Sequence, residues 1–234
     1  MSDTHKMTPR PRSDTGAVDE FLAQVKGLAP LRGEGRGRLV FALDATMSRQ
    51  PTWDLAQSIQ GEMFEAAAGQ GGLDVQLVYF RGFTECRASN FVSEGRGLAQ
   101  LMSRISCVSG RTQIGKVLQH VLTETRARPV GALIYIGDAM EEGLDVLAGA
   151  AGEMGLRGVK AFMFQEGADA GVARAYKEIA RLSGGAYAGF DAAAPGRLRD
   201  LLKAAAAYAS GGRLALEERA RGGEAAARLL LSQL

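Results

Sequence analysis

Residues 39–48 read Leu39-Val40-Phe41-Ala42-Leu43-Asp44-Ala45-Thr46-Met47-Ser48, five apolar residues followed by a polar segment. The apolar run does not alternate, which is typical of a strand buried on both faces of a parallel sheet. The polar segment places a carboxylate and two hydroxyls on alternate residues, so that all three can point the same way from an extended loop. These ten residues therefore predict a central strand with a polar site at its carboxyl end.

Strand-like and helix-like segments alternate along the rest of the chain. Further strands are predicted at 75–80, 84–91, 132–136, 159–164 and 186–190, and a hairpin-like connection joins the first two of these. Helical spacing of apolar residues marks the intervening segments, including one helix over 55–64 and others at 114–122, 172–182 and 195–209. This order predicts an α/β fold, a Rossmann-like, doubly wound, mainly parallel six-stranded sheet with one antiparallel edge strand.

The pattern divides the chain into three parts. Residues 1–37 contain a polar, disordered tail, a short amphipathic helix at 17–28 and a glycine-rich linker, and residues 38–212 form the α/β domain. Residues 213–234 form a helical tail that ends in a leucine cluster. We interpret 225–234 as an interaction element outside the core. Its leucines have three candidate places of burial: the domain, the N-terminal helix or another chain.

Composition excludes several classes of protein. The 234 residues include 28 basic and 26 acidic side chains, and the net charge of +2 gives no electrostatic case for nucleic-acid binding. No run of 18 apolar residues and no secretory signal is found, which predicts a cytoplasmic protein without a membrane span. The two cysteines, Cys86 and Cys107, are expected to be reduced and buried.

A second aspartate and a third hydroxyl complete the candidate site. Asp138 follows the predicted strand 132–136, and Thr112 lies in a loop just before a helix. Because parallel sheets bind ligands at the carboxyl ends of their strands, we expect these groups to meet. The full set is Asp44, Thr46, Ser48, Thr112 and Asp138. Two carboxylates and three hydroxyls suit a hard cation, Mg²⁺ first, with Mn²⁺ or Ca²⁺ as alternatives, and leave it able to accept one more anionic oxygen.

This arrangement resembles the metal-ion-dependent adhesion site (MIDAS) of von Willebrand factor A (VWA) domains, over about residues 38–210. Segments 84–119 and 162–167 are also similar to uncharacterised bacterial VWA domain-containing proteins. The resemblance implies that Thr46, Ser48 and Thr112 touch the metal, while Asp44 and Asp138 often act through water. Thr46 stands where the family more often has serine, and threonine offers the same oxygen.

The resemblance implies a metal-dependent adaptor that binds an Asp or Glu of a partner protein in the bacterial cytoplasm, sometimes beside an AAA+ ATPase. No Ser/His/Asp or Cys/His arrangement is found, so we expect no catalytic residues and no enzyme. One alternative stays open because residues 110–116 match the first seven positions of a P-loop, although Val117 lacks the hydroxyl of the eighth. That alternative is a nucleotidase or another Mg²⁺-dependent hydrolase. The other is a metal-free scaffold whose loop hydroxyls only cap helices.

Charged residues near the site are each open to two interpretations. Glu141 and Glu142 either add negative field near the ion or form a solvated turn. Arg81, Arg87 and Arg111 either ring the site and steer an acidic ligand, or are scattered surface charges.

Overall fold

The computed structural model describes residues 35–69, 71–191 and 194–234, apart from the side chain of Ser48. The helix predicted at 17–28 lies outside these ranges. Within them, six strands form one sheet in the order β3-β2-β1-β4-β5-β6. All neighbouring strands are parallel except β3, which is antiparallel to β2. The predicted fold class is confirmed. The strands are β1 (Gly37–Asp44), β2 (Leu73–Arg81), β3 (Glu85–Val92), β4 (Ala132–Gly137), β5 (Lys160–Glu166) and β6 (Ala186–Phe190).

The strand order creates a switch point beside β1. The chain builds the sheet from β1 toward β2 on one side and from β4 toward β6 on the other. Leu43 near the end of β1 is paired with Ile136 near the end of β4, so Asp44 and Asp138 follow on neighbouring strands. Open α/β sheets form their ligand crevice at such a point, because the connections leave in opposite directions there.

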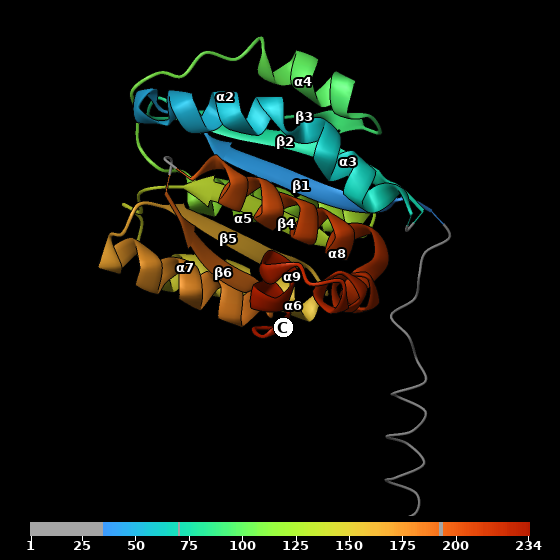
Figure 1. Ribbon diagram of the computed structural model, residues 1–234. Coiled ribbons are helices and arrows are strands. Elements are labelled where there is room, and N and C mark those ends of the chain that lie inside the picture. Colours follow the sequence, from blue (N-terminus) through green and yellow to red (C-terminus); the bar gives the residue numbers. More distant parts are fainter. Residues whose placement is uncertain (1–34, 70, 192–193) are drawn as a thin grey trace, which may run out of the picture. The chain divides into compact units, whose positions relative to one another are not determined.

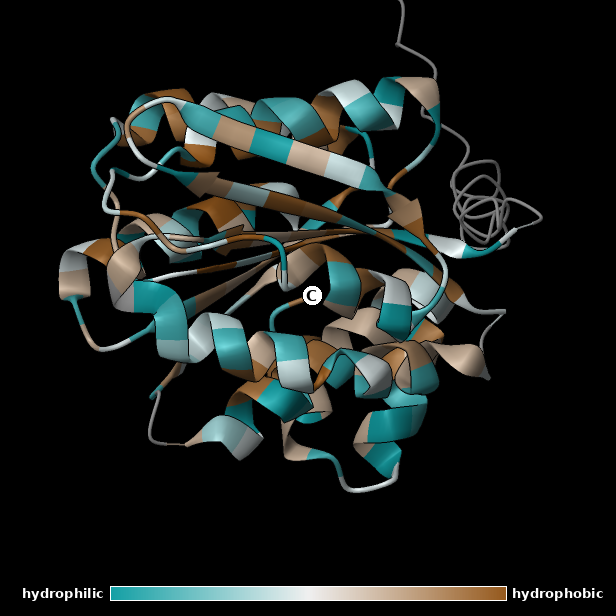
Figure 2. Ribbon diagram, turned by 90° about the horizontal axis from the view of Figure 1, so that it is seen from above, coloured by the Kyte–Doolittle hydropathy of each residue, from teal (hydrophilic) through white to brown (hydrophobic). Residues whose placement is uncertain are grey.

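Helices cover both faces of the sheet (Figure 1). One face carries α2 (Gln50–Ser58), α3 (Gln60–Ala68), α4 (Gly95–Met102), α8 (Pro195–Arg221) and α9 (Ala225–Leu231). The other carries α5 (Ile114–Ala127), α6 (Leu144–Leu156) and α7 (Ala170–Ser183). Figure 2 shows apolar colouring concentrated in the strands and hydrophilic segments over the helices. No helix in the described ranges is long and apolar enough to cross a membrane.

The position of β1 in the sheet explains why residues 39–43 are all apolar. Leu39, Phe41 and Leu43 pack in the core beneath the α8 face, whereas Val40 and Ala42 pack in the core on the α5 face. Successive side chains of a strand point to opposite faces, so a strand covered on both sides needs an apolar residue at every position. The carboxyl end of this strand is therefore held rigidly.

Two helical predictions are modified by the structure. The apolar spacing from Leu55 to Phe64 suggested one helix, but Ile59 leaves helical geometry (φ −103°, ψ 7°) and separates α2 from α3. The helix predicted to end near Gly212 is interrupted there, where the backbone leaves helical geometry at φ 67° and ψ −158°, and a second helical segment follows at once and runs to Arg221. Glycine tolerates this positive φ, so the chain can bend between the two helical segments of α8.

The prediction that residues 225–234 lie outside the core is wrong. Ala227 and Leu230 are fully buried in the core beneath α8, and Leu229, Leu231 and Leu234 pack against it. The bend at Gly212 brings α9 back against α8 and β6. Of the three burial places considered from the sequence, the domain itself takes the leucines.

One side chain after α9 pairs with the sheet edge. The Gln233 amide nitrogen donates to the Tyr187 carbonyl oxygen at 3.0 Å, and its amide oxygen accepts from the Tyr187 N–H at 2.9 Å. Tyr187 lies in β6, the last strand of the sheet order. The side-chain amide thus satisfies both backbone groups as a neighbouring strand would.

Candidate metal site

A pocket lies where β1 and β4 end, with a volume of about 290 Å³. Its lining residues are Asp44, Thr46, Met47, Ser109, Gly110, Thr112, Asp138, Ala139 and Glu141. Four of the five site residues predicted from the sequence are therefore brought together. Ser48 lies in the short 3-10 helix η1 (Met47–Arg49), and its side chain is outside the described part of the structure.

Asp44 is the most constrained carboxylate of the pocket. It ends β1, is only 4% exposed, and accepts a hydrogen bond from the Thr46 N–H at 2.8 Å. Burial raises the pKa of Asp44 to about 6, with a further increase from the nearby Asp138 charge, against the lowering effect of hydrogen bonds from Thr46. The raised pKa means that the local positive charge does not offset the cost of burying the ionised carboxylate, so a bound cation would fit its environment.

Thr112 is held by the loop that follows Asp138. Its hydroxyl oxygen accepts from the Glu141 N–H at 3.1 Å, and its own N–H donates to the Glu141 carboxylate at 3.1 Å. A hydroxyl oxygen has a second lone pair, so Thr112 keeps an acceptor position for a cation. The reciprocal bonds join the two loops that carry Thr112 and Asp138.

Two residues beside the site were missed by the sequence reasoning. The Arg49 guanidinium forms an ion pair with Asp138 at 3.1 Å and another with Glu166, and its side chain is only 10% exposed. Glu166 ends β5 and also accepts a hydrogen bond from the Thr52 hydroxyl. A signal was present, because Glu166 closes a buried strand as Asp44 does, and Arg49 follows Ser48 directly. Arg49 supplies Asp138 with a positive charge from within the protein.

Glu142 occupies the position that a phosphate would need in a P-loop. Its carboxylate accepts hydrogen bonds from the N–H groups of Ile114 and Gly115, the latter at 2.9 Å, at the N-terminus of α5. In a P-loop such helix-terminal amides hold the nucleotide phosphates. The side chain of Lys116 instead donates to the Thr84 carbonyl oxygen at 2.8 Å and to Gln113 at 2.7 Å. A helix, α4, also precedes this loop where a P-loop has a strand.

The acidic and basic neighbours therefore have definite partners, with one exception. Arg81 pairs with Glu85 at 3.0 Å and donates to the Ser106 carbonyl oxygen at 2.6 Å, and Arg87 pairs with Glu85 at 3.2 Å. Arg111 is exposed and forms no ion pair with any residue that the structure describes. Of these three arginines, Arg111 alone has no ion-pair partner in the described part of the structure.

The donor set decides which metals the pocket suits. Among the described residues, no three His, Cys, Asp or Glu side chains cluster closely enough to hold a metal, so hydroxyls have to contribute. The lining offers carboxylates and hydroxyls and contains no His or Cys. Such an oxygen set fits Mg²⁺, Mn²⁺ or Ca²⁺ better than softer transition metals.

Comparisons with known proteins identify the fold. No protein-family model and no curated protein matches the sequence. Among solved structures, an aerotolerance-related membrane protein from Bacteroides fragilis has 19% identity and a TM-score of 0.53, over 68% of this chain and 95% of that one. The SpRpn10 VWA domain has 9% identity and a TM-score of 0.55, over 70% of this chain and 95% of that one.

A third similar structure carries a metal. Proximal thread matrix protein 1 from the mussel byssus, with a zinc-occupied MIDAS motif, has 16% identity and a TM-score of 0.59. The match covers 74% of this chain but only 46% of the mussel protein. At these identities the likeness is one of fold. The chain has the fold of a VWA domain.

Proposed function

We propose that this chain is a protein-binding domain that depends on a divalent cation, Mg²⁺ in the cell. Asp44, Thr46, Ser48, Thr112 and Asp138 would hold the ion, and an Asp or Glu of a partner protein would complete its coordination. The observation that carries the proposal is the pocket itself, in which buried Asp44 lies with Asp138 and Thr112 at the switch point of the sheet. The zinc in the MIDAS of the mussel protein supports a divalent ion in this fold.

The charge balance favours a partner carboxylate. Two aspartates neutralise a divalent ion, and Arg49 is balanced by its second partner, Glu166. Hydroxyl ligands add no charge, so the bound ion keeps an attraction for one more anionic oxygen. We infer binding and not catalysis because the pocket lining contains no His, Cys or Lys. His120 lies on α5 with its ring nitrogen 2.8 Å from Gln76.

The cellular setting is proposed from the family resemblance alone. A bacterial, cytoplasmic adaptor fits the resemblance, and an AAA+ ATPase is one partner of the right class. These proposals depend on the metal site, because the site supplies the contact through which the adaptor would act.

A metal-free scaffold is the second candidate, and one observation favours it. Arg49 already gives Asp138 a counter-charge, and Thr112 is already hydrogen-bonded to Glu141. In that case the pocket would be stable as it is and would have no function in metal binding.

A metal titration separates the two candidates. Mn²⁺ would be added to the purified chain and the free ion measured by electron paramagnetic resonance, with Mg²⁺ as competitor. We expect one saturable site that Mg²⁺ competes for, loss of that site in Asp44→Asn, and no change in Asp200→Asn, which alters an exposed carboxylate on α8. No saturable binding, or equal binding by wild type and Asp44→Asn, would establish the scaffold instead. Circular dichroism checks that each variant is folded.

A further inference from the structure

Exposed apolar side chains gather around the candidate metal site. Met47 is 63% exposed, Phe83 74% and Val108 44%, and each lies in a connecting segment at the carboxyl end of the sheet, Met47 in η1. The described residues include only six large hydrophobic side chains that are exposed to this degree, and the other three are on α6 and α8. Half of these six side chains thus lie on the connecting segments at the end of the sheet where the pocket opens, and Met47 lines the pocket itself. We name Met47, Phe83, Val108 and Arg111 the rim.

The loops of the rim are joined to one another and to the site. The Val108 N–H donates to the Ala45 carbonyl oxygen at 2.9 Å, and the Arg111 N–H donates to the Gly82 carbonyl oxygen at 2.9 Å. A Cβ at Gly110 would overlap the backbone of Gly82, so these two loops are in direct contact. The rim is therefore one fixed surface, because backbone contacts hold its three loops in place.

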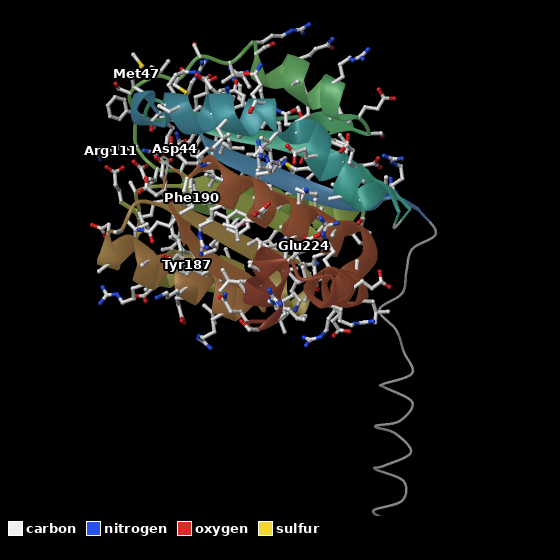
Figure 3. The ribbon with its side chains drawn as sticks, in the orientation of Figure 1. Asp44, Met47, Arg111, Tyr187, Phe190 and Glu224 are labelled. Atoms are coloured by element: carbon white, nitrogen blue, oxygen red, sulfur yellow. The ribbon has the colours of Figure 1, made fainter. Side chains whose placement is uncertain are left out.

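The rim adjoins the pocket directly. Met47 lines it together with Asp44 and Asp138, and Gly110, the neighbour of Arg111, lines it too. Figure 3 shows Asp44, Met47 and Arg111 at the same end of the sheet. A ligand group that reached the ion would consequently pass over apolar surface.

The rim also carries a positive charge, the Arg111 guanidinium, which favours an acidic partner. The Arg111 guanidinium lies 5.9 Å from the centre of the Phe83 ring and has no ion-pair partner among the described residues. The nearby acidic groups are engaged: Glu141 accepts from Thr112, and Glu142 accepts from the first amides of α5. With a cation in the pocket, the rim offers a partner apolar side chains beside two positive centres, the ion and the Arg111 guanidinium.

We propose that the rim is a docking surface for a segment of a partner protein that carries an acidic residue beside a large apolar residue. The carboxylate would reach the metal, the apolar side chain would lie against Met47, Phe83 and Val108, and a second acidic group would lie near Arg111. This proposal rests on the metal-dependent binding proposed above. Burial of one large apolar side chain strengthens binding by about tenfold to 100-fold, which is enough to discriminate between acidic segments.

Selection from a random peptide library tests this chemistry without a known partner. Phage that display random twelve-residue peptides would be bound to the full chain in Mg²⁺ and eluted with EDTA. We expect enrichment of Asp or Glu next to Leu, Ile, Met, Phe or Trp. Enrichment of acidic peptides without an apolar neighbour would overturn the rim proposal and leave metal-dependent binding intact. A lack of any enrichment by a chain that binds Mn²⁺ would also overturn the rim proposal and leave the metal site intact.

Variants of the rim give the second measurement, with one selected peptide as a fluorescent probe. Phe83→Ser with Val108→Ser should weaken peptide binding about tenfold or more, which corresponds to about 1.4 kcal/mol. Leu156→Ser, which alters a 92% exposed leucine on α6, should leave peptide binding unchanged. Equal weakening by both would overturn the proposal.

Metal affinity and self-association distinguish the remaining outcomes. Mn²⁺ affinity should be the same in the rim variant and the wild type, whereas failure of the wild type to bind Mn²⁺ refutes the proposed function itself. Analytical ultracentrifugation in Mg²⁺ checks for a second copy as the occupant. A metal-dependent dimer that is lost in Phe83→Ser would replace the partner segment with another copy of this chain and overturn the assignment.

Discussion

Replacing Asp44 with asparagine should make the metal-free protein more stable at neutral pH. Burial raises the pKa of Asp44 from 3.8 to about 6, so its ionisation opposes folding. The contribution of Asp44 to stability is complete below pH 3.8 and is lost as the pH rises through 6. At about 1.4 kcal/mol per pH unit, the ionised carboxylate costs the folded state up to about 3 kcal/mol at pH 7.

Asparagine keeps part of the local structure and removes the charge. Its side-chain oxygen can still accept from the Thr46 N–H, but its new NH₂ group needs a partner, which water in the open pocket can provide only in part. We therefore expect a net gain of about 1–2 kcal/mol, or about 2–8 °C in melting temperature for a chain of this size. Magnesium should reverse the order, because a concentration of about 100 times the Kd adds about 2.7 kcal/mol to the wild type only.

Thermal and urea unfolding in EDTA, followed by circular dichroism at several pH values, measure this difference. The advantage of Asp44→Asn should shrink as the pH falls from about 7.5 to about 4.5, since Asp44 becomes protonated in the wild type. Asp200→Asn should follow the wild type throughout. A variant that is less stable than the wild type in EDTA at neutral pH, or an advantage independent of pH, would refute this account of the pocket.

Four further results are expected. Mn²⁺ affinity should fall about tenfold per pH unit below 6, because Asp44 must lose its proton to bind, and a flat profile in the titration would argue against Asp44 as a ligand. Arg49→Met should raise Mn²⁺ affinity about tenfold or more by removing a cation beside Asp138, with Glu166→Gln added to avoid a buried, unpaired carboxylate. Weaker binding would show that Arg49 positions Asp138 for the metal. Leu230→Ala should destabilise the domain by about 2–5 kcal/mol in urea unfolding, and a neutral effect would place α9 outside the core. Lys116→Met should leave Mn²⁺ affinity unchanged, and neither protein should bind ATP in calorimetry.

The strands of the sheet could be predicted because the burial of each strand is visible in its own few residues. A strand buried on both faces needs consecutive apolar residues, and 39–43 and 132–136 show that requirement directly. The carboxyl ends of parallel strands lie at the same edge of a sheet, so the sequence alone predicts that the two aspartates that follow these runs lie close together. The neighbouring positions of Asp44, Thr46, Thr112 and Asp138 follow from this topology.

Other features depend on contacts that sequence patterns do not encode. The leucines of α9 required burial, but the bend at Gly212 decided where, and a glycine can adopt either sign of φ. The ion pair between Arg49 and Glu166 joins residues from two distant segments, and its formation depends on the tertiary fold that brings η1 near the end of β5. The sequence leaves Glu142 open to two interpretations, negative field near the ion or a solvated turn, whereas in the structure its carboxylate accepts hydrogen bonds from the first amides of α5.

The Gln233 amide also bears on how the protein behaves at high concentration. An edge strand with free N–H and C=O groups can recruit a strand from another molecule and start a growing aggregate. Gln233, just after α9, hydrogen-bonds both backbone groups of Tyr187 on β6, so the docked C-terminal segment covers this part of the sheet edge. Detachment of α9 would free both backbone groups of Tyr187 and expose the buried Leu230, so one event would both loosen the core and open this edge to a strand from another molecule. Protection of this edge against intermolecular pairing therefore depends on the docking of one short helix.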